Sequence, residues 1–218
     1  MPRRARDVQE LTRGRRVRGL TRAVEIGTTV FLRAPVASDR EEFLALRRAS
    51  RRFLAPWEPR PEPGDADPFT RLLRARRDPH HVRLLVCARA SGAIMGAVAL
   101  NEIVRGPFQS CFLGYWIGHE FARRGFMTEA VALIVRHAFA CLGLHRVEAN
   151  IIPKNRASLA LIRHAGFRHE GLARRYLCIA GRWQDHEHWA LTVEDWHARG
   201  AGRPSQRLLA HRGGRRVH

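Results

Sequence analysis

The chain of 218 residues has only four cysteines, a single lysine and few acidic residues. Cys87, Cys111, Cys141 and Cys178 lie far apart and form no C-x-x-C pair, which argues against both a zinc cluster and a disulfide scaffold. We therefore expect four small buried apolar groups. No run of roughly 18 uncharged apolar residues occurs, and the arginine-rich start lacks the apolar segment of an export signal. These absences predict a soluble, unexported protein of the cytoplasm with no membrane contact.

The shortage of acids leaves a formal net charge of +19, and much of that charge lies at the two ends of the chain. Segments 1–22 and 199–218 each carry +6, so the rest of the chain holds +7. Every basic residue except Lys154 is an arginine, so the preference for arginine reflects overall composition as much as phosphate binding. High charge with low apolar content is typical of disordered segments.

We predict a basic N-terminal extension (1–27), one folded domain (28–198) and a basic C-terminal tail (199–218). Both ends are interpreted as disordered. The alternatives are contact with RNA or the ribosome and, for the N-terminal end, a misassigned start codon.

The apolar pattern of segment 28–198 predicts strands and helices that alternate as in an α/β (α+β) fold. Strands are expected over 30–33, over 81–104 as two strands turning at Ser91-Gly92, over 111–117 and 145–152, and in a hairpin turning at Ala180-Gly181. Helices are expected after Ser38, with Glu41 completing a capping box, and over 69–77, 128–142 and 155–167. The result is a mixed sheet with helices on its faces.

The stretch "ARRGFMTEA" places Gly125 behind two arginines and just before a helix. The first turn of a helix leaves about four N–H groups unpaired, and a glycine lets the backbone approach an anion. Arg123 and Arg124 would add charge to such a phosphate site. Glu129 argues the other way, because its carboxylate could satisfy the helix dipole by itself. On local chemistry alone, a phosphate site and an ordinary loop are equally well supported.

The wider pattern resembles the GNAT superfamily of N-acetyltransferases, and within it the RimJ-type branch that acetylates ribosomal proteins at an N-terminal alanine. The resemblance rests on "LGYWIGHEFARRGFMTEA" and on "HRVEANIIPKNRASLALIRHAGF" with the hairpin that follows, and it spans roughly residues 28–198. The family motif R/Q-x-x-G-x-G/A falls on Ala122, Gly125 and Met127, so only its central glycine matches. The resemblance implies a GNAT fold, with a mixed central sheet of about six or seven strands that is splayed at the cofactor site.

The resemblance also implies acetyl-CoA as co-substrate and a set of contacts to it. The strand Tyr115, Trp116, Ile117 and Gly118 is expected to pair with the pantetheine arm. The loop residues expected around the pyrophosphate are Arg123, Arg124, Gly125, Phe126, Met127 and Thr128. Asn155 is expected beside the arm near the thioester, and Ser158 beside the leaving thiolate.

Three residues are candidates for catalysis. Ser158 is a candidate to protonate the sulfur, and Glu102 and Glu148 are candidates to accept the proton of the amine, with Glu102 preferred. Relatives carry a glutamate at the positions of Asn150 or Arg175, so the proton acceptor stays open, and a water relay is an alternative. No metal is expected in the reaction, since His186 and His188 lack a third ligand.

The predicted activity is transfer of acetyl to the N-terminal α-amino group of a protein, with a ribosomal protein beginning with alanine or another small residue as the expected partner. One alternative is acetylation of a small amine or antibiotic. Another is a non-catalytic protein associated with the ribosome or RNA. The oligomeric state is expected to be a monomer or a homodimer.

Overall fold

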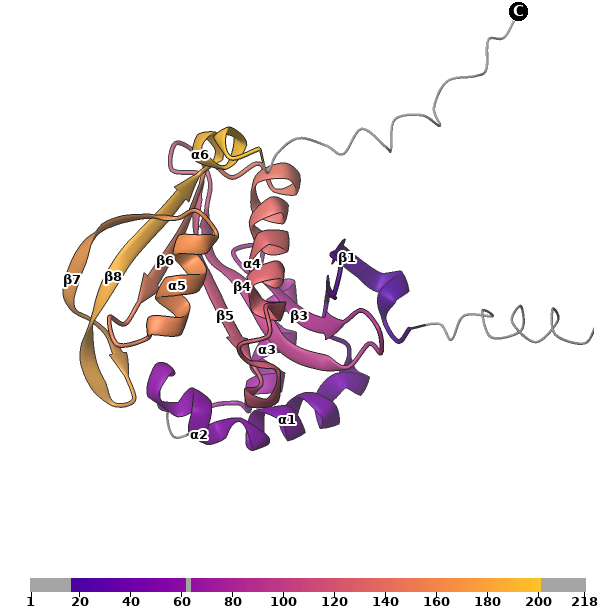
Figure 1. The fold of residues 1–218 in the computed structure, drawn as a ribbon. Coiled ribbons are helices and arrows are strands. Elements are labelled where there is room, and N and C mark those ends of the chain that lie inside the picture. Colours follow the sequence, from indigo (N-terminus) through magenta and orange to yellow (C-terminus); the bar gives the residue numbers. More distant parts are fainter. Residues whose placement is uncertain (1–16, 62–63, 201–218) are drawn as a thin grey trace, which may run out of the picture.

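A computed structural model describes residues 17–61 and 64–200, and their strands form one eight-stranded sheet (Figure 1). The strand order is β1-β2-β3-β4-β5-β6-β8-β7, and all neighbours are antiparallel except β5 and β6. The strands are β1 Ala23–Ile26, β2 Val30–Arg33, β3 Val82–Ala88, β4 Ile94–Val104, β5 Ser110–Ile117, β6 Arg146–Ile151, β7 Arg168–Ile179 and β8 Arg182–Thr192. The α-helices are α1 Arg40–Ala49, α2 Arg51–Leu54, α3 Pro68–Arg74, α4 Phe126–Arg136, α5 Arg156–His164 and α6 Val193–Ala198. The expected mixed sheet flanked by helices is confirmed, and it has eight strands.

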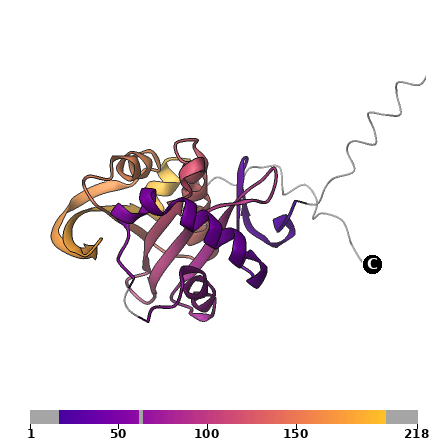
Figure 2. The same ribbon diagram turned by 90° about the horizontal axis from the view of Figure 1, so that it is seen from below.

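Successive side chains of the central strands are apolar and point to opposite sides of the sheet, so both of its faces are apolar there. On one face, Leu113 and Val147 pack with Val131 of α4 and Leu159 of α5. On the other face, α1 and α3 cover β2, β3 and the start of β4 through a separate cluster that includes Phe43, Phe69 and Leu85. Figure 2 shows these helices on opposite sides of the sheet.

The second face changes character over β6 and β8. Here the side chains that point to the side of α1 and α3 are polar, and we call this surface the polar face: Glu148 and Asn150 of β6 with His186 and His188 of β8. Asn150 lies directly opposite His188 in the strand register. The polar face therefore continues the surface of the sheet beyond the part that helices cover.

β1 was not predicted, and it lies inside the segment 1–27 that was interpreted as disordered. It pairs antiparallel with β2. The turn between the two strands is held by Glu129 of α4, whose carboxylate accepts hydrogen bonds from the N–H groups of Thr28 and Thr29 and from the Thr29 hydroxyl. The sheet thus begins earlier than expected. Residues 1–16 of the predicted extension and 201–218 of the predicted tail lie outside the described residues.

The predicted capping box of Ser38 and Glu41 is wrong. Helix α1 begins at Arg40 after a 3-10 turn, and among the described residues no side chain caps its first turn. Asp39 is fully buried instead, and its carboxylate receives both guanidinium nitrogens of Arg33, at 2.7 and 2.8 Å. Burial alone would raise the pKa of Asp39, but the bonds from Arg33 and from the N–H of Val36 lower it overall. A buried charge pair, rather than a cap, fixes the start of α1.

Two further expectations need correction. The helix expected over 128–142 begins two residues earlier, and a π-helical turn, His137–Cys141, follows α4. Cys87 and Cys111 are buried as expected, whereas Cys141 and Cys178 are exposed. Burial raises the pKa of Cys87 to about 11 and that of Cys111 to about 12, as expected for thiols in an apolar core. Within residues 17–61 and 64–200, no helix is long and apolar enough to cross a membrane.

Candidate active site

The two parallel strands separate along their length and open a wedge in the sheet. Strands β5 and β6 pair at three positions, and Phe112 with Glu148 is the last of them. Beyond this point β5 stays paired with β4 as far as Ile117, and β6 stays paired with β8 as far as Ile151. The wedge therefore lies between the carboxyl ends of β5 and β6, and the predicted splay is present.

The backbone of β5 faces into this wedge at alternate residues. The N–H of Gly118 donates to the carbonyl of Met95 on β4, at 2.8 Å. Hydrogen-bonding directions alternate along an antiparallel strand. Trp116 therefore bonds to β4, while the N–H and C=O groups of Tyr115 and Ile117 point to the side that β6 has left. An extended ligand in the wedge can pair with these groups as an added strand would.

Helix α4 starts beside the open end of the wedge with a cluster of N–H groups. Gly125 is its N-terminal capping residue, with φ 82° and no side-chain cap among the described residues. The first-turn N–H groups of Phe126, Met127 and Thr128 consequently have no partner within the helix. Together with the helix dipole they favour an anion.

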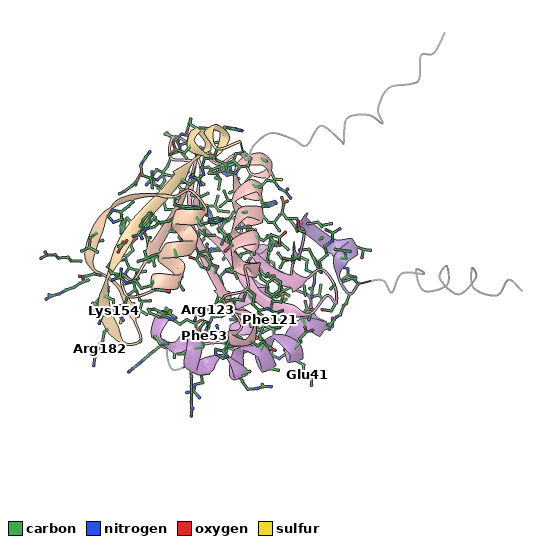
Figure 3. All side chains as sticks on the ribbon, viewed as in Figure 1. Glu41, Phe53, Phe121, Arg123, Lys154 and Arg182 are labelled. Atoms are coloured by element: carbon green, nitrogen blue, oxygen red, sulfur yellow. The ribbon has the colours of Figure 1, made fainter. Side chains whose placement is uncertain are left out.

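Two arginines flank this helix start, and both are exposed. Arg123 has φ 62°, a left-handed conformation that is uncommon outside glycine. The guanidinium of Arg124 lies 5.0 Å from the centre of the Phe126 ring. In Figure 3, Arg123 lies near the start of α4, on the same edge of the molecule as Lys154 before α5. Positive charge is thus gathered at the edge where the wedge opens.

Glu129 no longer argues against an anion site, because its carboxylate is engaged elsewhere. It reaches the turn between β1 and β2, and Thr29 donates its N–H to Oε2 at 3.0 Å. Burial opposes ionisation of Glu129, but the bonds from Thr29 and Thr28 lower its pKa overall. The ionised carboxylate anchors the turn and leaves the first turn of α4 uncapped.

Helix α5 starts on the other side of the wedge. The Oδ1 atom of Asn155 accepts the N–H of Ser158 at 3.2 Å and caps the helix. Burial raises the pKa of Tyr115 to about 12, and the nearby Ser158 acts in the opposite direction. The Tyr115 hydroxyl is buried beside Ser158, although the two do not meet the geometry of a full hydrogen bond. The structure thus brings Tyr115, Asn155 and Ser158 together on the side of the sheet that carries α4 and α5.

The two glutamates named from the sequence lie in different surroundings. Glu148 is at the closed end of the wedge, where its carboxylate accepts hydrogen bonds from Arg146 at 3.0 Å and Ser110 at 3.2 Å. Glu102 occupies an irregularity in β4 with φ 49°, and its side chain is 68% exposed, 3.9 Å from His81. Glu148 is therefore tied into the sheet, and Glu102 is turned largely to solvent.

The polar face brings Asn150 and His188 together with Tyr176, a grouping that was not predicted from the sequence. The Tyr176 ring lies 4.8 Å from that of His188, and its hydroxyl is 3.4 Å from Nδ2 of Asn150. Oδ1 of Asn150 and Nε2 of His188 are buried and have no hydrogen-bond partner among the described residues. Such atoms call for an explanation in a native fold. Only the strand register, which a single sequence does not reveal, brings them together.

The short segment after α2 contacts the tip of the β7–β8 hairpin, next to the polar face. The carbonyl of Glu58 accepts the N–H of Ala180 at 2.9 Å. The carboxylate of Glu58 is bound by Arg47 at 2.5 and 2.7 Å, and Arg47 lies 4.8 Å from the centre of the Trp116 ring. We call residues 55–60 the strap, because they link the helical side of the molecule to the hairpin.

A groove of about 800 Å³ begins at Gly125 and leads away from the wedge along the solvent side of α4. Thr128 and Arg136 line its α4 wall, and His164 and Arg199 lie near its other side. The wedge and this groove therefore meet at the start of α4.

Comparison with known proteins identifies the family. A model described as "Acetyltransferase (GNAT) domain" matches residues 29–168. This chain belongs to the GNAT acetyltransferase family. It is thus an N-acetyltransferase with the GNAT fold that its sequence led us to expect.

Three relatives of this GNAT enzyme show how far the similarity extends. A probable N-acetyltransferase of Bacillus subtilis, YjcK, is 31% identical over 78% of this chain and 97% of its own length. The ribosomal protein uS5-alanine N-acetyltransferase of Escherichia coli is 41% identical over 47% of this chain, a match that spans 53% of that enzyme. The structure of Mycobacterium smegmatis RimJ in complex with CoA-disulfide is 28% identical, with a TM-score of 0.70 over 79% of this chain and 90% of that one. The similarity to RimJ-type enzymes is confirmed.

Proposed function

We propose that this enzyme transfers acetyl from acetyl-CoA to the N-terminal α-amino group of a protein, and that the acceptor is a ribosomal protein beginning with alanine or another small residue. The observation that carries the proposal is the 41% identical match to a ribosomal-protein-alanine N-acetyltransferase. The wedge beside the uncapped start of α4 supports it.

The described residues fit acetyl-CoA. The exposed backbone groups of Tyr115 and Ile117 suit the amide-rich pantetheine arm. The N–H groups after Gly125 suit the pyrophosphate, with Arg123 and Arg124 adding charge. The groove beyond Gly125 has room for the nucleotide half of the molecule. The thioester would then lie in the wedge between β5 and β6, beside the backbone of β5.

The chemistry proposed is direct attack by a neutral amine. A bond forms from the amine nitrogen to the acetyl carbon, the carbon–sulfur bond breaks, the nitrogen loses a proton and the sulfur gains one. A backbone N–H near Ile117 is the proposed donor to the developing oxyanion. Ser158 is the proposed proton donor to the sulfur, and Asn155 holds Ser158 at the first turn of α5.

We further propose that the acceptor approaches from the polar face, on the opposite side of the sheet from Ser158. Oδ1 of Asn150 can accept there from the N–H groups of an amine, and so can Nε2 of His188 when the imidazole carries its proton on Nδ1. The strap beside the hairpin would favour an extended, narrow acceptor such as a protein N-terminus. Glu102 stays the preferred proton acceptor, and Glu148 stays the alternative, which would have to be released from Arg146 to serve.

The test measures thiol release from acetyl-CoA with an alanine-starting peptide, using the same peptide with a blocked N-terminus as control. Turnover is expected with the free peptide only. Turnover on lysine side chains or small amines, with none on free N-termini, would refute the proposal in favour of a small-amine acetyltransferase. Binding of acetyl-CoA without turnover on any amine would support a non-catalytic role. Mass spectrometry of ribosomal proteins from a strain lacking the gene then identifies the acceptor by its missing acetyl group.

A further inference from the structure

Three potential metal ligands converge outside the active site, where β1 meets the end of α4 (Figure 1). Glu25 comes from β1, and His137 and Cys141 come from the π-helical turn after α4. Among the described residues, these three offer ligand atoms that all lie within 4.8 Å of one another. Segments more than one hundred residues apart in sequence are thus joined by groups of a kind that bind zinc.

The two distances from Glu25 are close to those between the ligands of a tetrahedral ion. Nδ1 of His137 is 3.3 Å from Oε1 of Glu25, and Sγ of Cys141 is 3.8 Å from the same oxygen. With zinc bonds of about 2.0–2.1 Å to nitrogen or oxygen and about 2.3 Å to sulfur, neighbouring ligands are about 3.3–3.6 Å apart. The third pair, Nδ1 of His137 and Sγ of Cys141, lies within 4.8 Å, so these two atoms would move toward each other to share one ion.

The two oxygens of Glu25 have separate roles. The guanidinium of Arg136 binds Oε2, with Nε at 2.9 Å. Oε1 faces His137 and Cys141. A ligating carboxylate is commonly held by a hydrogen bond of this kind on its other oxygen. Arg136 consequently orients the carboxylate and leaves the oxygen that a metal would use.

The π-helical turn after α4 contains both His137 and Cys141. The N–H of Leu142 donates to the carbonyl of His137, five residues back. π-helical turns are rare, and those that are found often lie at functional sites. Glu25 is only 7% exposed, whereas Cys141 is exposed, so an ion could enter from the cysteine side and keep a water as its fourth ligand.

We propose that Glu25, His137 and Cys141 bind a thiophilic divalent cation, with Zn²⁺ as the best match to one thiolate, one imidazole and one carboxylate. On binding, the Cys141 thiol loses its proton to solvent and a metal–sulfur bond forms. The carboxylate and the thiolate balance the charge of the ion. The site would tether β1 to the turn after α4, away from the proposed site of acetyl transfer. The proposal is independent of the acetyl acceptor.

The experiment titrates the full chain, purified metal-free under a non-thiol reductant, with Co²⁺ as the probe. A thiolate ligand gives a sulfur-to-cobalt charge-transfer band, which distinguishes this site from the other histidines of the chain. We expect a band that saturates at one equivalent and disappears when Zn²⁺ is added. The Cys141→Ser variant should bind at least tenfold more weakly and lack the band. The matched control is Cys178→Ser, which removes the other exposed thiol and should leave the band unchanged.

Thermal unfolding supplies a second readout. Zn²⁺ should raise the melting temperature of the wild type and of Cys178→Ser, but not that of Cys141→Ser. Circular dichroism checks that each variant is folded. If no charge-transfer band forms, or if Cys141→Ser keeps it, the proposal is wrong. The three side chains then form only a hydrogen-bonded group, in which the imidazole and the thiol donate to Glu25.

Discussion

The start of α4 allows a sharp test of the proposal that backbone N–H groups there bind the pyrophosphate of CoA. Gly125 has φ 82° and ψ −14°, and a Cβ built there would meet nothing within 4 Å. A substitution at Gly125 therefore adds backbone strain without a clash inside the protein. An L-residue in this left-handed region costs about 1–2 kcal/mol, except that asparagine tolerates it better.

The expected losses follow from this strain. Since 1.4 kcal/mol corresponds to about tenfold, Gly125→Ala should weaken CoA binding roughly 5- to 30-fold if the ligand selects the left-handed conformation. Gly125→Asn should lose less, and Gly125→Val should lose most, because a β-branched residue fits this conformation worst. Arg123→Ala removes one exposed charge, worth about 0.2–1 kcal/mol, so its loss should be no more than about fivefold.

Isothermal titration with CoA measures these affinities. Thermal unfolding of the free enzyme shows whether the strain lowers the stability of the fold instead of the affinity for CoA. The two mechanisms also differ in salt dependence. The Arg123→Ala loss should shrink as ionic strength rises, because salt screens exposed charge, whereas the Gly125→Ala loss should persist. A larger loss for Arg123→Ala than for Gly125→Ala, or equal losses for Gly125→Asn and Gly125→Ala, would refute the reasoning. Side-chain charge, rather than backbone N–H groups, would then hold the phosphates.

Four other predictions concern single side chains. Asn155→Ala should cost about 1 kcal/mol of stability through the lost cap, and Asn155→Asp should restore it; if both variants lose CoA affinity equally in titration, Asn155 contacts the ligand. Ser158→Ala should lower kcat at least tenfold with little change in CoA affinity, and equal loss of both would remove its role as proton donor. Glu148→Gln should lower the free energy of unfolding by about 1 kcal/mol and leave kcat within threefold, whereas a hundredfold fall in kcat would make Glu148 the proton acceptor. The folded-state pKa of Asp39 lies below its unfolded value, so its pairing with Arg33 stabilises the fold above that unfolded value and is lost as pH falls through the folded pKa. Urea unfolding should therefore show Asp39→Asn about 3–5 kcal/mol less stable at neutral pH, with the gap closing below about pH 4.

The sequence predicted the central elements well because each carries a strong local signal. The strand β2 begins with the β-branched Val30 and the aromatic Phe31, and the two-residue turn at Ala180-Gly181 takes positive φ at both positions. The long apolar period of α4 placed that helix to within two residues. Local signals failed where partners distant in sequence decide the structure. β1 has four residues beside an arginine-rich segment, and its place depends on pairing with β2 and on Glu129 anchoring the adjoining turn.

The same distinction separates the two halves of the candidate site. On the side proposed to hold CoA, Gly125, Asn155 and Ser158 lie at helix starts as expected, because the residue type itself has a local conformational or capping meaning there. Their contacts with CoA stay predictions. The polar face, where the acceptor is proposed to bind, was not predicted. Asn150 and His188 are ordinary strand residues in the sequence, and they meet only because β6 and β8 pair in one register.

A shift of that register by one residue would send one of these side chains to the opposite face of the sheet and leave the other alone. If the acceptor approaches from the polar face as proposed, its recognition depends on strand pairing. Substitutions that alter the β7–β8 hairpin should therefore change the acceptor KM before they change CoA affinity.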